Sequence, residues 1–144
     1  MALRASRGVL VVSFLLVAGC GGTWDDDPGN WQRAFGSTKP SNVAVLHSKY
    51  WRSAHWSYEF QYFFEIAANE TLKNQFVATN NLRLATATDA ERIKSDIVGE
   101  VPRWFAPKEA TGYEVWATDE TADRNMVLLI DRQSGHLFVT DYLV

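Results

Sequence analysis

The chain has 144 residues, a formal net charge of −3 and a single cysteine. A mildly acidic chain is a poor candidate for binding nucleic acid, because phosphate contacts need clustered Lys and Arg. One cysteine excludes a disulfide within the chain, so the fold needs a hydrophobic core, and the length suits one domain. The chain has 6 Trp and 8 Phe, which predicts a core rich in rings.

The first nineteen residues have the layout of an export signal. Arg4 and Arg7 precede an apolar stretch over residues 9–18, and small residues follow. A membrane-spanning helix needs roughly 20 apolar residues, and this stretch has about half that number. The order of a basic region, an apolar region and small residues is typical of a cleaved secretory signal peptide. We therefore expect residues 1–19 to be removed on export.

The sequence Val17-Ala18-Gly19-Cys20 resembles the lipobox of bacterial lipoproteins. In that family the cysteine sulfur is acylated and the chain is cut before it. The resemblance implies that Cys20 becomes an acylated N-terminus that anchors the protein in a lipid bilayer, on the periplasmic side. Several acyl chains give stable attachment. The next residue is Gly21, not aspartate, which by the same resemblance favours the outer membrane over the inner one.

The composition of residues 20–40 predicts a lipidated, flexible and acidic tether. They contain Gly21-Gly22, the acidic run at residues 25–27 and Pro28-Gly29, a composition that disfavours regular structure. A flexible segment of about 20 residues spans roughly 25 Å. We expect Trp31 to dock back onto a domain formed by residues 41–144.

Residues 56–66 carry the clearest pattern in the chain, and it predicts the core strand. Aromatic and β-branched residues occupy every second position, and the remaining positions are mostly polar. Period two places the two sets on opposite faces of a β-strand. The first set consists of Trp56, Tyr58, Phe60, Tyr62, Phe64 and Ile66. Residues 43–51 are expected to form a strand before it, although a short helix is also possible.

Two helices and a strand meander are predicted after this strand. Asn69 can cap a helix over about 70–80, and Thr88 with Glu91 fits the capping box of a helix that ends near Gly99 and Pro102. A short edge strand is possible at 82–84. Strands are expected at 113–118, 126–131 and 136–142. The prediction is one α+β domain, an antiparallel sheet of four to five strands with one face packed on two helices.

The candidate catalytic residues do not form a convincing constellation. His55, Ser57 and Glu59 match a hydrolase triad in type, but alternate residues of a strand stand about 6.6 Å apart. Glu59 and Glu65 would be roughly 20 Å apart, too far for a glycosidase pair. A cross-strand partner such as Glu114 stays possible for Glu59. The three histidines lack metal-ligand spacing. We expect no metal and no cofactor.

The candidate binding residues are aromatic. Trp104 and Phe105 lie between Pro102 and Pro107, which would stiffen a loop that presents both rings. The alternative is that both rings plug the end of the sheet. Phe63 is the one ring on the polar face of its strand. It marks a contact patch if that face is exposed, and it is core if the face is covered. The polar binding candidates on the same face are Glu59 and His55.

These observations favour a non-enzymatic binding module that engages an envelope protein or the cell wall, for example as an inhibitor or immunity lipoprotein. One alternative is a cell-wall hydrolase that uses Glu59 or Glu114 with His55. Another is an accessory subunit of an envelope assembly machine. The proline-bracketed loop and the Ile-Asp-x-x-x-Gly hairpin resemble uncharacterised secreted bacterial domains, without a named family.

Overall fold

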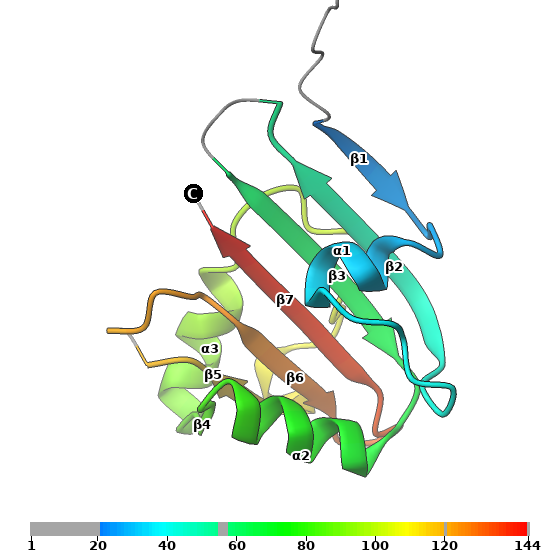
Figure 1. Cartoon of the computed structure of the whole chain (residues 1–144). Helices are drawn as coiled ribbons and strands as arrows, with labels where there is room; N and C mark the ends of the chain where they lie inside the picture. Colours follow the sequence, from blue (N-terminus) through cyan, green and yellow to red (C-terminus); the bar gives the residue numbers. More distant parts are fainter. Residues whose placement is uncertain (1–20, 55–57, 120, 144) are drawn as a thin grey trace, which may run out of the picture.

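The computed structural model describes residues 21–54, 58–119 and 121–143. These form one antiparallel sheet in the order β1-β2-β3-β7-β6-β5-β4 (Figure 1). The strands are β1 (Gly22–Asp25), β2 (Val45–Arg52), β3 (Phe60–Ile66), β4 (Arg83–Leu84), β5 (Tyr113–Ala117), β6 (Val127–Asp131) and β7 (Leu137–Leu143). The helices are α1 (Asn30–Phe35), α2 (Glu70–Thr79), α3 (Ala87–Ser95) and the 3-10 helix η1 (Ala110–Gly112). The predicted α+β class is confirmed, but the prediction of four to five strands is wrong because the described sheet has seven.

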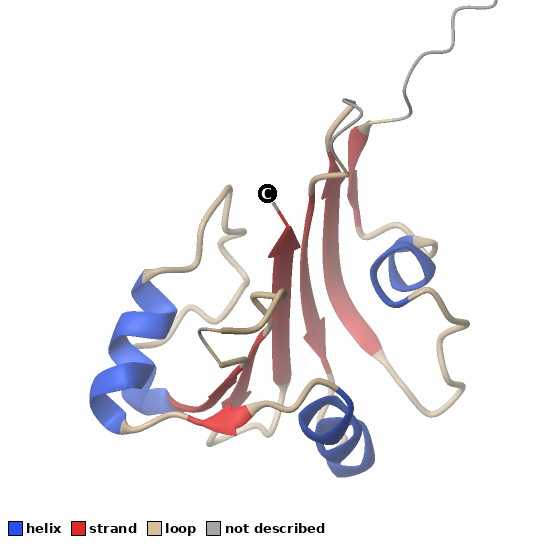
Figure 2. Ribbon diagram, turned by 60° about the vertical axis from the view of Figure 1, so that its left-hand side comes forward, coloured by secondary structure: helices blue, strands red, loops and turns tan. Residues whose placement is uncertain are grey.

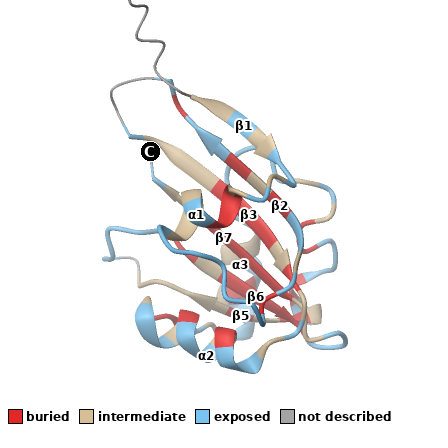
Figure 3. Cartoon of the chain, turned by 45° about the vertical axis from the view of Figure 1, so that its right-hand side comes forward, coloured by how far each residue is buried: buried red, intermediate tan, exposed pale blue. Residues whose placement is uncertain are grey.

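The first face of the sheet is covered by α1 and α2. The predicted alternation in β3 is confirmed here, since Tyr62, Phe64 and Ile66 are fully buried on this face. Trp31 from α1 and Phe76 from α2 pack onto them. The central strands of the sheet are accordingly its most buried part (Figure 3).

The second face is covered by α3 and by residues 104–110. Phe105 packs edge-on against Phe63 and Phe138, with ring centroids 5.0 and 5.8 Å apart, and Ala90 of α3 joins the same cluster. Helices therefore lie on both sides of the sheet, as Figure 2 shows. The prediction that helices cover only one face is wrong, because β3 buries rings on both of its faces and β7 presents Phe138 to the second face.

The segment expected to be a flexible tether is ordered from residue 22 to residue 35. β1 pairs antiparallel with β2, and Trp24 lies 6.0 Å from Tyr50 between ring centroids. The amide of Asn30, which is fully buried, donates to the Trp24 carbonyl and to Ser48 Oγ. Trp31 is 5% exposed, so its predicted docking is confirmed. The Pro and Gly residues here shape turns within the fold and do not make a linker.

Both later helices begin with a side-chain cap. The predicted cap of α2 is confirmed, since Asn69 Oδ1 accepts from the Leu72 amide at 2.9 Å. α3 begins two residues earlier than expected, with Thr86 as its cap, and ends at Ser95. The expected continuation to Gly99 is wrong, and residues 97–101 instead run beside the sheet. Among the described residues, no helix is long and apolar enough to cross a membrane.

Candidate ligand groove

The part of the second face that α3 and residues 104–110 leave uncovered is floored by four strands. Direct pairing places Thr23, Trp51, Gln61 and Tyr142 in one row across β1, β2, β3 and β7. The row beneath it contains Lys49 and Phe63. Residues that alternate along a strand share a face, so both rows point to the same side of the sheet.

A cavity of about 450 Å³ lies over these two rows. We call it the second-face groove. Its floor is formed by the two rows, and its wall is formed by Val98, Gly99 and Glu100. Trp51 is 37% exposed, so a large ring is accessible at the groove. Ligand sites in proteins are commonly concave, largely apolar and lined by a few placed polar groups, which fits this composition.

Two side chains fasten the wall to the floor. Gln61 donates from Nε2 to the Val98 carbonyl oxygen at 2.5 Å, and Lys49 Nζ lies 3.2 Å from Glu100 Oε2. Gly99 has a φ of +86°, and a Cβ on it would lie 2.0 Å from Gln61 Oε1. Only glycine fits between Val98 and Glu100 in this conformation. The groove is thus built by segment 97–101 standing against β2 and β3.

Deeper on the second face, the polar groups pair with one another and leave the groove apolar at its inner end. His136 Nδ1 lies 2.9 Å from Glu65 Oε1. His47 stacks on Trp104 with ring centroids 5.3 Å apart and an angle of 26° between the rings. No nucleophile is part of this group, and among the described residues no cluster of His, Cys, Asp or Glu could hold a metal ion. These contacts fix segment 102–107 to the sheet.

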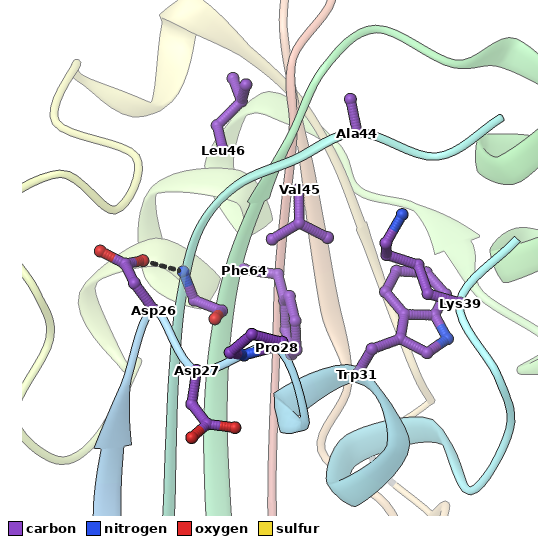
Figure 4. Close-up of a pocket in the computed structure, with 10 residues that line it drawn as sticks. Asp26, Asp27, Pro28, Trp31, Lys39, Ala44, Val45, Leu46 and Phe64 are labelled. Carbon is purple, nitrogen blue, oxygen red and sulfur yellow. Dashed lines mark hydrogen bonds between the residues drawn. The ribbon is translucent and has the colours of Figure 1, made fainter. Parts of the chain in front are cut away.

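A second cavity, of about 330 Å³, lies beside α1 on the first face (Figure 4). Its polar groups are used within the fold. Asp26 accepts from the Ser48 amide, and the Lys39 ammonium donates to the Val43 carbonyl. Asp27 accepts from Arg33 and from the Gly29 amide, and these hydrogen bonds hold the pKa of Asp27 below its usual range. The polar groups around this cavity therefore hold α1 and the segments beside it in place. The second-face groove is the better candidate for a ligand site.

The structure assigns the predicted aromatic binding residues mainly to the core. Of the two interpretations left open for the loop, exposed rings or rings that plug the sheet, the second fits Phe105, which is 4% exposed. Trp104 is half-buried against His47 and Phe105. Phe63 is 2% exposed and is a core residue, with one edge lining the groove. The structure fits the interpretation in which Trp104 and Phe105 cover the end of the sheet. The second face presents the apolar rings of Phe63 and Phe138, and these need an apolar cover.

The predicted polar candidates fall outside the groove. Glu59 lies at the turn before β3, where its carbonyl oxygen accepts from the Ser53 amide. Glu114 is on the row of Ile66, seven positions along β3 from Glu59, or about 23 Å. Glu114 is also held by Trp116 and Lys73, which lower its pKa. A Glu59–Glu114 pair is therefore excluded by the register. His55 and Cys20 lie outside the described residues.

Sequence reasoning missed the residues that make the groove. Trp51, Gln61 and Tyr142 are on different strands, and Val98 was expected to continue a helix. Two residues could have indicated the groove wall. Gly99 permits a positive φ, which ends a helix, and the apolar Val98 beside it needs a surface to pack against. No protein family, no curated protein and no solved structure matches this chain.

Proposed function

We propose that this protein is a bacterial lipoprotein, anchored by acylated Cys20 on the periplasmic side of the envelope, that binds an envelope partner without catalysing a reaction. The observation that carries the binding role is the second-face groove, with its accessible Trp51 and its fixed wall. The lipobox resemblance supports the anchor and, through Gly21, the outer membrane.

The chemistry of the groove favours an apolar or aromatic group of the partner. Trp51 and Tyr142 present rings, and Thr23 and Gln61 offer polar groups at the same row. Such a floor accommodates an apolar side chain of an envelope protein or the flat face of a cell-wall sugar, since Trp provides both area and a hydrogen-bond donor. The ligand would enter a prepared site, which lowers the ordering cost of binding.

The hydrolase alternative would need a carboxylate pair other than Glu59 with Glu65 or Glu114, since these pairs are too far apart. An accessory role in an envelope assembly machine is a form of the same proposal, in which the partner is a protein of that machine.

The test uses the full acylated chain in supported vesicles, exposed either to crosslinked envelope extract or to isolated cell-wall sacculi. Trp51→Ala should reduce retention of the true partner about tenfold or more. Leu84→Ala is the matched control, because Leu84 is 56% exposed on β4 at the far edge of the sheet. Trp104→Ala tests the proline-bracketed loop separately.

Equal retention by the wild type and Trp51→Ala, with loss in Trp104→Ala, would move the binding surface to residues 102–107 and overturn the groove. Turnover of cell-wall material by the wild type would overturn the non-enzymatic role. Incorporation of a palmitate analogue into the wild type and its loss in Cys20→Ser would support the anchor.

A further inference from the structure

One end of the sheet lies next to the anchor residue. Pairing places Gly22, Arg52, Phe60 and Leu143 in the last row of β1, β2, β3 and β7. Cys20 is two residues before Gly22, and consecutive Cα atoms are about 3.8 Å apart. Only Gly21 separates Cys20 from this row in the sequence. We call residues 52–54, 58–60 and 143 the anchor end.

Gly21, which is bonded to Cys20, is packed against the anchor end. A Cβ on Gly21 would lie 2.4 Å from the Ala54 nitrogen and 2.7 Å from the Ser53 carbonyl carbon. The backbone of Gly21 thus touches the backbone of the β2–β3 connection, and no flexible spacer follows it. The acyl chains on Cys20 would enter the bilayer directly beside Ala54.

The anchor end carries exposed apolar side chains. Tyr58 is 54% exposed and Leu143 is 39% exposed, and Phe60, which pairs with Leu143, has its ring 6.0 Å from the Tyr58 ring. The guanidinium of Arg52 lies 4.5 Å from the centroid of the Tyr58 ring. Trp and Tyr are favoured at the boundary between headgroups and acyl chains, where arginine can meet lipid phosphate.

The remainder of the described surface lacks such a group. Trp51 and Val98 belong to the second-face groove, and Leu46, Leu84 and Val101 are not in the last row. The turn at the opposite end of β7 is polar, with Asp131, Arg132 and Gln133. Single exposed apolar residues are normal on soluble surfaces, whereas a group at one end marks a contact.

We propose that the anchor end rests in the headgroup layer of the bilayer that holds Cys20, so that the domain lies directly against the membrane. This inference rests on the proposed acylation of Cys20. The acyl chains supply the attachment, and the side chains of Tyr58 and Leu143 set the orientation. The floor of the second-face groove begins at the row next to this end, so the groove takes its ligand at the lipid surface.

The test places a fluorescent label at Ala54→Cys in the full acylated chain. The acylated Cys20 has no free thiol, so the introduced cysteine is labelled alone. The protein is incorporated in vesicles of phosphatidylethanolamine and phosphatidylglycerol that contain a lipid with a nitroxide headgroup. Leu84→Cys is the matched control, because Leu84 lies on β4 at the far edge of the sheet and on the row of Phe64, four positions or about 13 Å along β3 from the last row.

We expect the label at position 54 to be quenched at least twofold by the nitroxide lipid and the label at position 84 to be unaffected. Adding Tyr58→Ser and Leu143→Ser should reduce the quenching at position 54. Both changes are at exposed side chains, so the fold is retained.

Equal, weak quenching at both positions would overturn the inference, since the domain would then stand away from the bilayer. Quenching that grows with the protein-to-lipid ratio, together with self-quenching of the label, would assign the surface to a second copy of the chain and overturn it as well. Labelling of the wild type would show a free Cys20 thiol and would overturn the proposed anchor itself.

Discussion

Gln61 holds the wall of the groove by donating a hydrogen bond to the carbonyl oxygen of Val98. The two residues are far apart in the sequence, and this bond, with the Lys49–Glu100 ion pair, joins segment 97–101 to the sheet. The shape of the groove therefore depends on a small number of contacts, and these can be altered without touching the core.

Gly99→Ala should open the groove. The added methyl group would overlap Gln61 Oε1, and alanine at a φ of +86° is strained by about 1 kcal/mol. We expect the Gln61–Val98 bond to break and hydrogen exchange in residues 97–101 to rise at least tenfold. The melting temperature of the sheet should change little.

Gly36→Ala is the matched control for this change. Gly36 also has a positive φ, +66°, but nothing lies within 4 Å of an added Cβ. It tests backbone strain alone, at the end of α1. If both substitutions leave the exchange of residues 97–101 unchanged, Gln61 does not hold the wall.

Trp31→Ala should destabilise the fold by about 3 kcal/mol, because a large buried ring is removed from the first-face core. A residue of a flexible tether would have no effect on the free energy of unfolding. Urea unfolding followed by circular dichroism measures the difference. Gln32→Ala, at an exposed neighbouring position of α1, should stay within about 0.5 kcal/mol of the wild type.

Arg124→Ala should leave a buried carboxylate without its cation. Asp141 is fully buried, and Arg124 donates to it from Nε at 2.8 Å and again from a terminal nitrogen. Since Arg124 is half-exposed, we expect a loss of about 3 kcal/mol at pH 7, at the lower end for such pairs. Equilibrium unfolding in urea gives the value.

The defect of Arg124→Ala should shrink in acid. Burial raises the pKa of Asp141, while Arg124 opposes that rise. A carboxyl group with a raised folded pKa destabilises the fold as pH rises through that value, so removing Arg124 extends the loss to a higher pH. Unfolding at pH 5 should show a smaller deficit than at pH 7. The same deficit at both values would contradict the role of the Asp141 charge.

Asp131→Asn should remove acid-sensitive stability at the β6–β7 turn. The ammonium of Lys108, 2.7 Å away, and the Gln133 and Ser134 amides lower the pKa of Asp131 to about 2. This stability is present above pH 3.8, the ordinary pKa, and is lost as pH falls toward 2. Because solvent screens Lys108, we expect a loss of roughly 1 kcal/mol at pH 7.

The asparagine keeps an oxygen for the amides of the turn, so only the charge is removed. Urea unfolding should show a deficit for Asp131→Asn relative to the wild type at pH 7 and a smaller deficit at pH 2, where about half of the Asp131 carboxyl groups are protonated. A constant difference would assign the effect to packing.

The elements with strong local signals could be predicted from the sequence. The alternation in β3 and the Asn69 cap of α2 each depend on neighbours in the chain, and both are found. β1 and α1 were missed because Asp27 and Gly29 resemble a linker. In the fold they make a turn, in which Asp27 accepts from the Gly29 amide.

The groove could not be predicted, because its residues come together only through strand pairing. Trp51, Gln61 and Tyr142 meet across β2, β3 and β7. Val98 follows apolar residues at helical spacing, so periodicity favoured a longer helix, and the bond from Gln61 is a tertiary contact. Gly21 has a steric role that sequence alone could not show, since the connection at Ser53–Ala54 leaves it no side chain.

The strand order has a consequence for when this protein can fold. β7 lies between β3 and β6, so the unit β1-β2-β3 and the unit β4-β5-β6 are joined in the sheet only by the last strand. β3 and β6 therefore each keep one unpaired edge until β7 forms. Contacts between distant parts of a chain form slowly. The sheet thus stays open until β7 joins it, which would suit the export that we propose for this chain, since an exported chain is threaded through a narrow translocation channel before it folds.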